Sequence, residues 1–219
     1  MKEIILNHKM NFVKEEILSY IEKLNNLETS HNVVVCPSFI YLPYFSSCKF
    51  KLGSQDVSAY KGKLTGDISS EQLRSLGVEY TIVGHSERRE KYSETNELIN
   101  KKIKRLKEEC IIPILCVGEG ENENYKEVIL KQLENVILEN VIIAYEPLVS
   151  IGTGVALKKE KIEEVIIFIK NNVLSNTKVI YGGSVDINNY KELLESKIID
   201  GLLIGGASLD VNKLCQIIN

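Results

Sequence analysis

The chain has 219 residues, of which 44% are hydrophobic, and a formal net charge of -3 at pH 7. This length and apolar content suffice for one sizeable core, so we expect a single domain spanning residues 1–219. Basic residues are spread along the chain rather than clustered, which argues against a nucleic-acid or anionic-membrane partner.

The N-terminal stretch has too few successive apolar residues for a secretory signal, and no run approaches the roughly 18 apolar residues of a membrane span. The five cysteines are an odd number without CxxC spacing, which is typical of reduced thiols rather than of a disulfide framework or a zinc site. We therefore expect a cytoplasmic protein without a metal or a cofactor.

Eight short runs of apolar, β-branched residues alternate with segments in which apolar residues recur at three- and four-residue spacing. In chain order the runs cover residues 3–6, 33–36, 50–55, 80–84, 112–117, 141–145, 178–182 and 201–205. Helical patterns between them include residues 13–27, 95–109, 125–138 and 158–173.

Apolar strands joined by crossover helices predict a parallel sheet that is buried on both faces, and eight such units predict closure into a (β/α)8 barrel. An open doubly wound sheet is the alternative fold. That fold usually carries a glycine-rich dinucleotide loop after its first strand, and residues 5–12 contain no glycine.

If the chain is a barrel, its functional polar residues should directly follow the predicted strands, because active sites of such barrels lie at the carboxyl ends of the strands. Unusual residues do follow the predicted strands. In chain order they are Asn7, Lys9, Gln55, His85, Glu119, Glu146, and the stretches YGGS (181–184) and IGGAS (204–208).

Glu146 stands out among them, in the stretch AYEPLVSIGTG (144–154). Pro147 stiffens the backbone directly after the carboxylate, while Gly152 and Gly154 allow conformations that other residues avoid. This pattern predicts a carboxylate at the base of a movable loop.

Eight motifs, in chain order, resemble those of the triosephosphate isomerase family. They are NHKMN (7–11), CPSFIYL (36–42), TGDIS (65–69), GHSERR (84–89), PILCVGE (113–119), AYEPLVSIGTG (144–154), YGGSV (181–185) and DGLLIGGASL (200–209). The resemblance covers nearly the whole chain. It implies interconversion of dihydroxyacetone phosphate and D-glyceraldehyde 3-phosphate, a step of glycolysis and gluconeogenesis, by proton transfer through an enediolate.

The resemblance also implies roles for individual residues. Glu146 matches the family's catalytic base, and His85 matches the neutral imidazole that donates to the substrate. Lys9 and Asn7 match the groups that bind the substrate and stabilise charge on its oxygens, and Glu87 matches the acid that positions the lysine and relays protons. The phosphate group of the triose is expected to contact Gly152, Ser184, Gly205 and Gly206.

Residues 55–69 resemble the loop with which the family's subunits reach a neighbouring active site, and Thr65 matches the residue at its tip. A loop of this length without a regular pattern is typical of a functional segment. We therefore expect a homodimer formed through this loop.

Some positions depart from the family's pattern. His8 and Val149 stand where the family has tryptophan, and Ser150 stands where it has alanine. Strand alternation predicts that His8 faces away from Asn7 and packs. Val149 cannot donate an indole hydrogen bond, so we expect an altered equilibrium between the open and closed states of the loop that follows Glu146. Glu119 matches the family's usual partner of that indole, and we expect it to be left to water or to the neighbourhood of Lys9.

The chain is also about thirty residues shorter than the roughly 250 of a typical barrel, mainly around residues 120–140 and 157–177, which predicts shortened outer helices. Two alternative functions stay open. One is a catalytically weakened relative that binds a sugar phosphate or a protein partner. The other is a different phosphosugar isomerase or an aldolase on the same fold, for which Lys9 is the candidate Schiff-base lysine.

Overall fold

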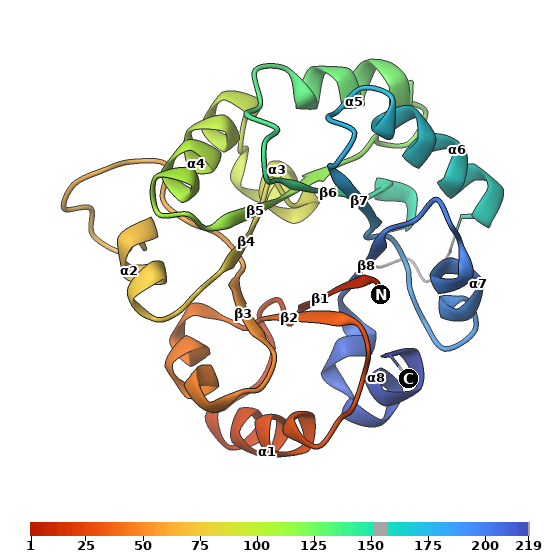
Figure 1. The fold of residues 1–219 in the computed structure, drawn as a ribbon. Coiled ribbons are helices and arrows are strands. Elements are labelled where there is room, and N and C mark those ends of the chain that lie inside the picture. The colour runs from red at the N-terminus through yellow and green to blue at the C-terminus, as the bar shows by residue number, and fades with distance from the viewer. Residues whose placement is uncertain (151–156, 219) are drawn as a thin grey trace.

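The computed structural model describes residues 1–150 and 157–218, and the predicted barrel of eight parallel strands is confirmed (Figure 1). In chain order the strands are β1 (Glu3–Asn7), β2 (Asn32–Cys36), β3 (Lys51–Ser54), β4 (Tyr80–Val83), β5 (Ile112–Val117), β6 (Ile142–Tyr145), β7 (Lys178–Tyr181) and β8 (Gly201–Ile204). Each strand pairs with its chain neighbours, and β1 pairs with β8 to close the ring, with Ile4 opposite Leu202.

Helices surround the strands on the outside (Figure 1). They are α1 (Lys14–Asn25), α2 (Ser70–Ser75), α3 (Ser86–Tyr92), α4 (Asn96–Glu108), α5 (Tyr125–Leu133), α6 (Lys159–Lys170), α7 (Tyr190–Glu195) and α8 (Val211–Ile218), with short 3-10 helices η1 (Phe39–Ser47), η2 (Leu148–Ser150) and η3 (Gly206–Leu209). Among the described residues no helix is long and apolar enough to cross a membrane.

The outer helix α5 is shorter than its sequence pattern predicts. It has nine residues and ends at Leu133, whereas the apolar periodicity extends to residue 138. Glu134 is extended and Asn135 has a φ of 60°, in the left-handed region that asparagine tolerates better than most residues. The chain therefore leaves the helical path after Leu133.

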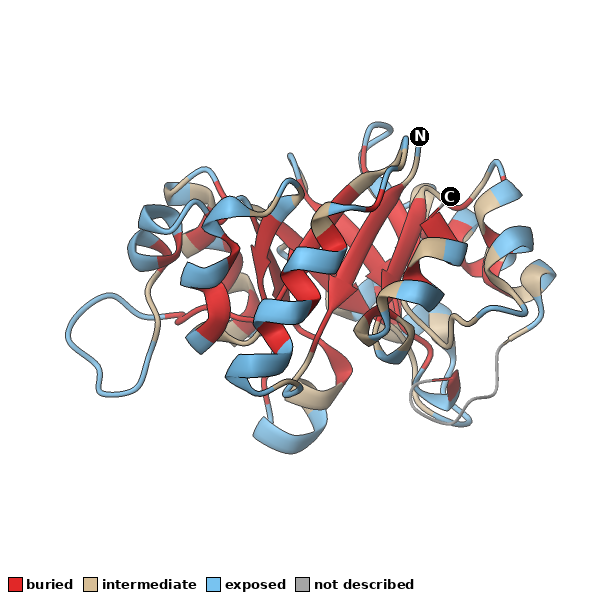
Figure 2. Cartoon of the chain, turned by 90° about the horizontal axis from the view of Figure 1, so that it is seen from below, coloured by how far each residue is buried: buried red, intermediate tan, exposed pale blue. Residues whose placement is uncertain are grey.

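The apolar residues of the strands divide between two layers, because successive side chains point to opposite faces. Ile4 and Leu6 pack outward against the helices, whereas Ile5 lies inside the ring. The inner layer consists of Ile5, Val34, Cys36, Tyr80, Ile82, Ile114, Cys116, Ile142, Ala144, Ile180 and Leu203. Each fully buried side chain of this size contributes about 1.5–3 kcal/mol, and Figure 2 shows the strands buried in the middle of the barrel.

His8 faces the helices, as predicted from strand alternation, and is fully buried. Its ring lies 5.1 Å from Phe12 and 4.8 Å from Tyr20, measured between centroids. The Tyr20 hydroxyl donates to the Ser208 carbonyl at 2.7 Å, so at 3.2 Å the His8 Nε2–H is the donor to the Tyr20 oxygen. Burial lowers the pKa of His8 to about 3. The neutral imidazole thus links β1 through α1 to η3.

The segment before α2 projects from one side of the barrel (Figures 1 and 2). Its base is held by a backbone hydrogen bond from Ser58 to the Ile68 carbonyl and by one from the Ser58 hydroxyl to Asp67, at 2.8 and 2.6 Å. Thr65 is exposed near the tip.

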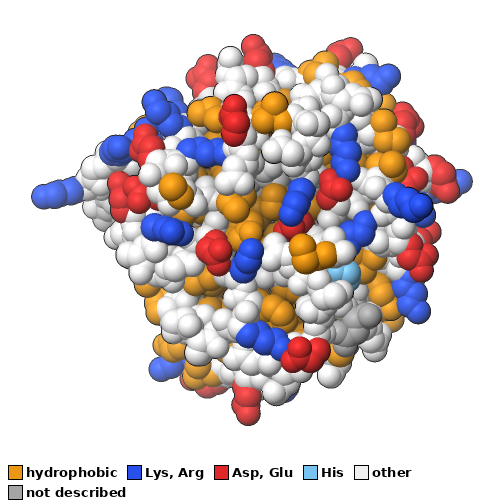
Figure 3. Space-filling model, viewed as in Figure 1, with side chains coloured by type: hydrophobic (Ala, Val, Ile, Leu, Met, Phe, Trp, Pro, Cys, Tyr) orange, Lys and Arg blue, Asp and Glu red, His pale blue; other side chains and the backbone are white. Residues whose placement is uncertain are grey.

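A buried cluster of ion pairs anchors this segment to the barrel. Asp56 accepts from Lys102 of α4 at 2.6 Å and pairs with Arg88 of α3 at 2.8 Å. Glu94 pairs with the same two cations, each at 2.6 Å. On the face of the barrel where the strands begin, charges of both signs are interspersed (Figure 3).

Candidate active site

The carboxyl ends of five strands, β1, β4, β6, β7 and β8, meet at a cavity of about 210 Å³. It is lined by predicted site residues and by their neighbours, namely Asn7, Lys9, His85, Glu146, Gly182, Gly183, Ser184, Val185, Leu203, Gly205, Gly206 and Ala207. Glu87 is joined to this group through Lys9. Gly152, expected to contact phosphate, lies outside the described residues, as does the loop tip at residues 151–154. The barrel thus brings together residues that are up to 200 positions apart in the chain, from Asn7 to Ala207.

Glu146 follows β6 and is 2% exposed. Its Oε2 accepts a hydrogen bond from the Ser86 backbone N–H at 3.2 Å, and its Oε1 lies 3.3 Å from His85 Nε2. Gly182 gives the side chain its room, because a Cβ there would lie 2.9 Å from Glu146 Cγ. The carboxylate therefore rests against the first turn of α3.

The contact with Ser86 was not predicted from the sequence, because a backbone donor has no side-chain signature. The available signal was the position of Ser86 as the first residue of α3. The first N–H groups of a helix have no partner within the helix, so they are available to a carboxylate.

His85 immediately precedes α3 and is 6% exposed. Its Nδ1 accepts from the Glu87 backbone N–H at 3.2 Å. A ring nitrogen that accepts carries no hydrogen, so in this geometry the imidazole is neutral and its hydrogen is on Nε2. That Nε2–H points into the cavity, toward Glu146.

Lys9 is held in an unusual backbone conformation, with a φ of 51°. Its N–H donates to Asn7 Oδ1 at 3.0 Å, and its carbonyl accepts from Gln55 Nε2 at 2.8 Å and from Ser38 Oγ at 2.9 Å. A left-handed conformation at a non-glycine residue persists only where its surroundings hold it. The sequence placed Gln55 at the end of a strand and so at the rim of the barrel. It did not indicate that Gln55 donates to the Lys9 carbonyl.

Glu87 pairs with the Lys9 ammonium at 2.7 Å. Burial by itself would raise the pKa of Glu87, but the hydrogen bond from Lys9 and the positive charge of Lys9 hold that pKa below its ordinary value. The carboxylate is therefore ionised at neutral pH, and it fixes Lys9 at the edge of the cavity.

The loops after β7 and β8 supply the other wall. Ser184 lies in the first, where its carbonyl accepts from Asn189 Nδ2 at 2.9 Å, and Gly205 and Gly206 lie in the second. A Cβ on Gly205 would lie 3.5 Å from Lys9 Cε, so this backbone passes close to the cation. Backbone N–H groups beside a lysine are a favourable setting for an anion.

Glu119 does not occupy the position expected of it. The sequence indicated that it is left to water or to the neighbourhood of Lys9, and this was wrong. Its Oε1 accepts a hydrogen bond from the Tyr145 hydroxyl at 2.9 Å. Tyr145 stands opposite Val117 in the pairing of β5 with β6, which brings its ring beside the residues that follow β5. Burial raises the pKa of Tyr145, so the hydroxyl is the donor.

Comparison with known proteins agrees with this geometry. A family profile described as "Triosephosphate isomerase" matches residues 2–219. The chain belongs to the triosephosphate isomerase family. The triosephosphate isomerase of Buchnera aphidicola subsp. Cinara cedri is 39% identical, over 98% of this chain and 96% of its own length.

Two further triosephosphate isomerases are similarly close. That of Mesomycoplasma hyopneumoniae strain 232 is 38% identical over 100% of this chain and 99% of its own length, and that of Clostridium tetani is 39% identical over 97% and 94%. The match to the triosephosphate isomerase profile extends from before β1 to past α8, so it includes every strand that contributes to the cavity.

Proposed function

We propose that the chain, folded as one domain over residues 1–219, interconverts dihydroxyacetone phosphate and D-glyceraldehyde 3-phosphate in the 210 Å³ cavity. Membership of the triosephosphate isomerase family makes the chain an isomerase of glycolysis, and a catalytically weakened relative is not favoured. The main support for placing the reaction in this cavity is that Glu146 Oε1 lies 3.3 Å from His85 Nε2, in a cavity that Lys9 also lines.

Glu146 is the base in this proposal. Moving a carbonyl group by one carbon requires removal of a proton from the adjacent carbon, and a positioned carboxylate can carry that proton between the two carbons. Glu146 Oε1 is buried and has no hydrogen-bond partner among the described residues. This oxygen is therefore open to a substrate proton, while Oε2 stays on the Ser86 N–H.

His85 and Lys9 stabilise the charge that develops on the substrate oxygens. The His85 Nε2–H donates to the oxygen that becomes the enediolate, and the Lys9 ammonium supplies a fixed positive charge, with Asn7 as a further polar contact. Gln55 donates to the Lys9 carbonyl, and the Glu87 N–H donates to Nδ1 of the His85 ring. Both donors are therefore held in place before substrate binds. Glu87 positions Lys9 through their ion pair.

The phosphate group takes the opposite wall, at Ser184, Gly205 and Gly206. These residues line the same cavity as Lys9, and glycine amides approach an anion closely. Gly152 is the remaining contact that the resemblance implies.

Hydrogen exchange during turnover tests the base. Purified protein is incubated with dihydroxyacetone phosphate in deuterium oxide, and the products are followed by proton NMR. We expect D-glyceraldehyde 3-phosphate that carries deuterium at C2, because the abstracted proton exchanges with solvent. A control with borohydride addresses the aldolase alternative: adduct formation at Lys9 would support a Schiff base and contradict the role proposed here.

A homodimer is the second part of the proposal. The loops after β1, β2 and β3 are neighbours in the barrel, and each exposes a large apolar side chain: Met10, Ile40 and Leu64 are 96%, 71% and 47% exposed. Apolar side chains gathered on one side of a monomer are typical of an interaction surface. Thr65 lies beside Leu64, so a twofold dimer of this side would carry it toward the partner.

Light scattering after gel filtration tests the dimer. We expect twice the chain mass of 24.7 kDa for the unmodified protein. The pair of substitutions Ile40→Glu and Leu64→Glu is expected to give the monomer mass, because it places charge where apolar surface would be buried. The control substitution Leu174→Glu, at a leucine that is 41% exposed in the segment before β7, on the opposite face, is expected to leave the mass unchanged. A monomeric unmodified protein would refute the dimer.

We place the protein in the cytoplasm. Cys36 and Cys116 are buried inside the barrel as thiols, which suits a reducing compartment. Fractionation of the source cells tests this placement, and recovery outside the cytoplasmic fraction would contradict it.

A further inference from the structure

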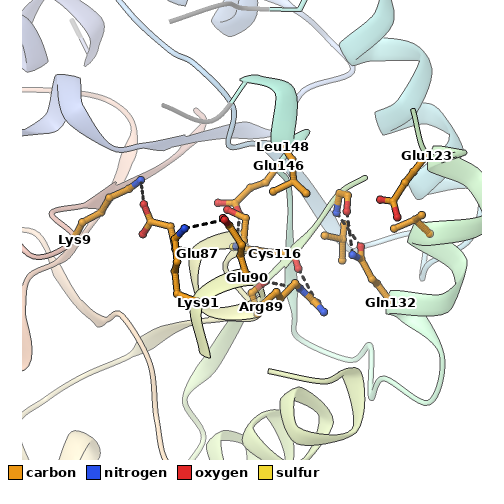
Figure 4. A pocket seen from close by; sticks show the side chains of 15 residues that line it. Lys9, Glu87, Arg89, Glu90, Lys91, Cys116, Glu123, Gln132, Glu146 and Leu148 are labelled. Carbon is orange, nitrogen blue, oxygen red and sulfur yellow. Dashed lines mark hydrogen bonds and ion pairs between the residues drawn. The ribbon is translucent and has the colours of Figure 1, made fainter. Parts of the chain in front are cut away.

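A second and larger cavity lies on the other side of Glu146. Its volume is about 760 Å³, within the range of small-molecule sites and more than three times that of the substrate cavity. The residues that line it are Lys9, Gly84, Ser86, Glu87, Arg89, Glu90, Lys91, Cys116, Val117, Gly118, Glu123, Val128, Gln132, Glu146 and Leu148. Figure 4 shows Glu146 and Leu148 on one border and Arg89 and Gln132 on another.

One wall of the cavity lies between the end of β5 and α5. Gly118 and α5 form this wall, and the Gln132 side chain closes it with two hydrogen bonds to the Gly118 backbone, at 2.8 and 3.0 Å. Val128 is partly buried on the same helix.

Arg89 is the charged group in this cavity that lacks an opposite charge. Its guanidinium donates to the Gly84 carbonyl at 2.7 Å, the Asn96 side-chain oxygen at 2.7 Å and the Cys116 carbonyl at 3.2 Å. Those three bonds use one N–H on each nitrogen and leave two of the five N–H groups. Among the described residues no carboxylate forms an ion pair with it, unlike its neighbour Arg88.

The other charged groups of the cavity have partners. Lys9 pairs with Glu87 at 2.7 Å and Lys91 pairs with Glu90 at 2.8 Å. Glu123 accepts from the Gly120 N–H at 2.6 Å, and Glu146 from the Ser86 N–H at 3.2 Å. Burial lowers the pKa of Arg89, while the more distant charges of Glu146 and Glu94 act in the opposite direction. Since no described carboxylate lies within ion-pair distance of it, one negative charge can still be placed directly on the Arg89 guanidinium.

The residues that line the cavity indicate which net charge a ligand should carry and that the rest of the ligand should be apolar. Four carboxylates line the cavity, so a phosphate dianion would meet more repulsion than a singly charged group. A carboxylate matches the two remaining N–H groups of a guanidinium in bidentate geometry. Val117, Val128 and Leu148 offer apolar surface beyond it.

We propose that this second cavity is a binding site for a small monocarboxylate with an apolar body. Its carboxylate pairs with Arg89, and its body packs against Val128 and Leu148. Leu148 belongs to η2, two residues after Glu146. An occupant that packs on Leu148 holds the segment that carries the base, so binding lowers turnover. This last consequence rests on the role proposed above for Glu146, whereas binding itself does not.

Binding to this cavity can be tested with hexanoate, and hexanamide, which has the same chain length but no charge, is the control. Titration calorimetry with the full chain is expected to show saturable binding of hexanoate in the millimolar range or tighter, and binding of hexanamide at least about tenfold weaker, since the ion pair contributes about 1.4 kcal/mol or more. Steady-state assays are expected to show a lower kcat with an unchanged KM.

Two pairs of variants locate the site. Val128→Phe fills the cavity and is expected to weaken hexanoate binding at least about tenfold without loss of basal activity, whereas Leu130→Phe, on the exposed side of the same helix, leaves it unchanged. Arg89→Gln is expected to abolish the preference for hexanoate over hexanamide. Thermal melting shows whether each variant is folded.

Three outcomes overturn the proposal: no saturable binding, binding that Val128→Phe does not weaken, or inhibition that competes with substrate, which would place hexanoate in the phosphate region. If hexanoate binds as expected but the chain shows no isomerase activity, the proposed function fails and the binding site stands.

Discussion

Replacing Glu146 by aspartate is expected to lower kcat of the isomerisation at least about a hundredfold, or about 2.7 kcal/mol in the barrier. Aspartate keeps the carboxylate but is one methylene shorter, so the oxygen that takes the proton retreats by about 1 Å. A displacement of that size from an attacking geometry costs about two orders of magnitude. KM should change little, because the phosphate contacts at Ser184, Gly205 and Gly206 are untouched.

The matched control is Glu121→Asp, at an exposed glutamate of the loop that follows β5. It makes the same chemical change at the same end of the barrel and is expected to keep kcat within about twofold. Steady-state rates in both directions, measured with a coupled assay, check the two variants. A rate for Glu146→Asp equal to that of the control would mean that another group removes the proton.

The strands and the rim residues could be predicted because they depend on local pattern. Short apolar runs predicted the bounds of all eight strands to within one residue, as for β6, expected at residues 141–145 and observed at Ile142–Tyr145. Alternation predicted that His8 faces the helices while Asn7 faces the cavity. Both inferences need only the period of a strand and the rule that barrel sites lie at strand ends.

The contacts across the rim could not be predicted, because they depend on how neighbouring elements are placed in space. The hydrogen bond from Tyr145 to Glu119 requires the register of β5 against β6, and the bond from Ser86 to Glu146 requires the position of α3. The end of α5 at Leu133 followed from the left-handed backbone of Asn135. The cavity beside Arg89 likewise depends on how α3, α5 and the end of β5 are placed around it in space.

Replacing His85 by glutamine is expected to lower kcat at least about a hundredfold as well, for a different physical reason. Glutamine can donate a hydrogen bond, but the Glu87 N–H no longer fixes its orientation as it fixes the His85 ring through Nδ1. Removal of one preorganised donor to a developing oxyanion costs about 2.7–4 kcal/mol. The loss should fall on kcat more than on KM, because the charge that the donor stabilises develops during the reaction.

The control is His31→Gln, since His31 lies beside the N-terminus, where its Nδ1 accepts from the Lys2 N–H at 3.2 Å. It is expected to leave kcat unchanged. Nitrogen NMR of the unmodified protein provides an independent check, because the accepting Nδ1 requires a neutral ring with its hydrogen on Nε2. A spectrum of a doubly protonated His85 ring at neutral pH would contradict the proposed donor, since the Glu87 N–H cannot donate to a nitrogen that already carries a hydrogen.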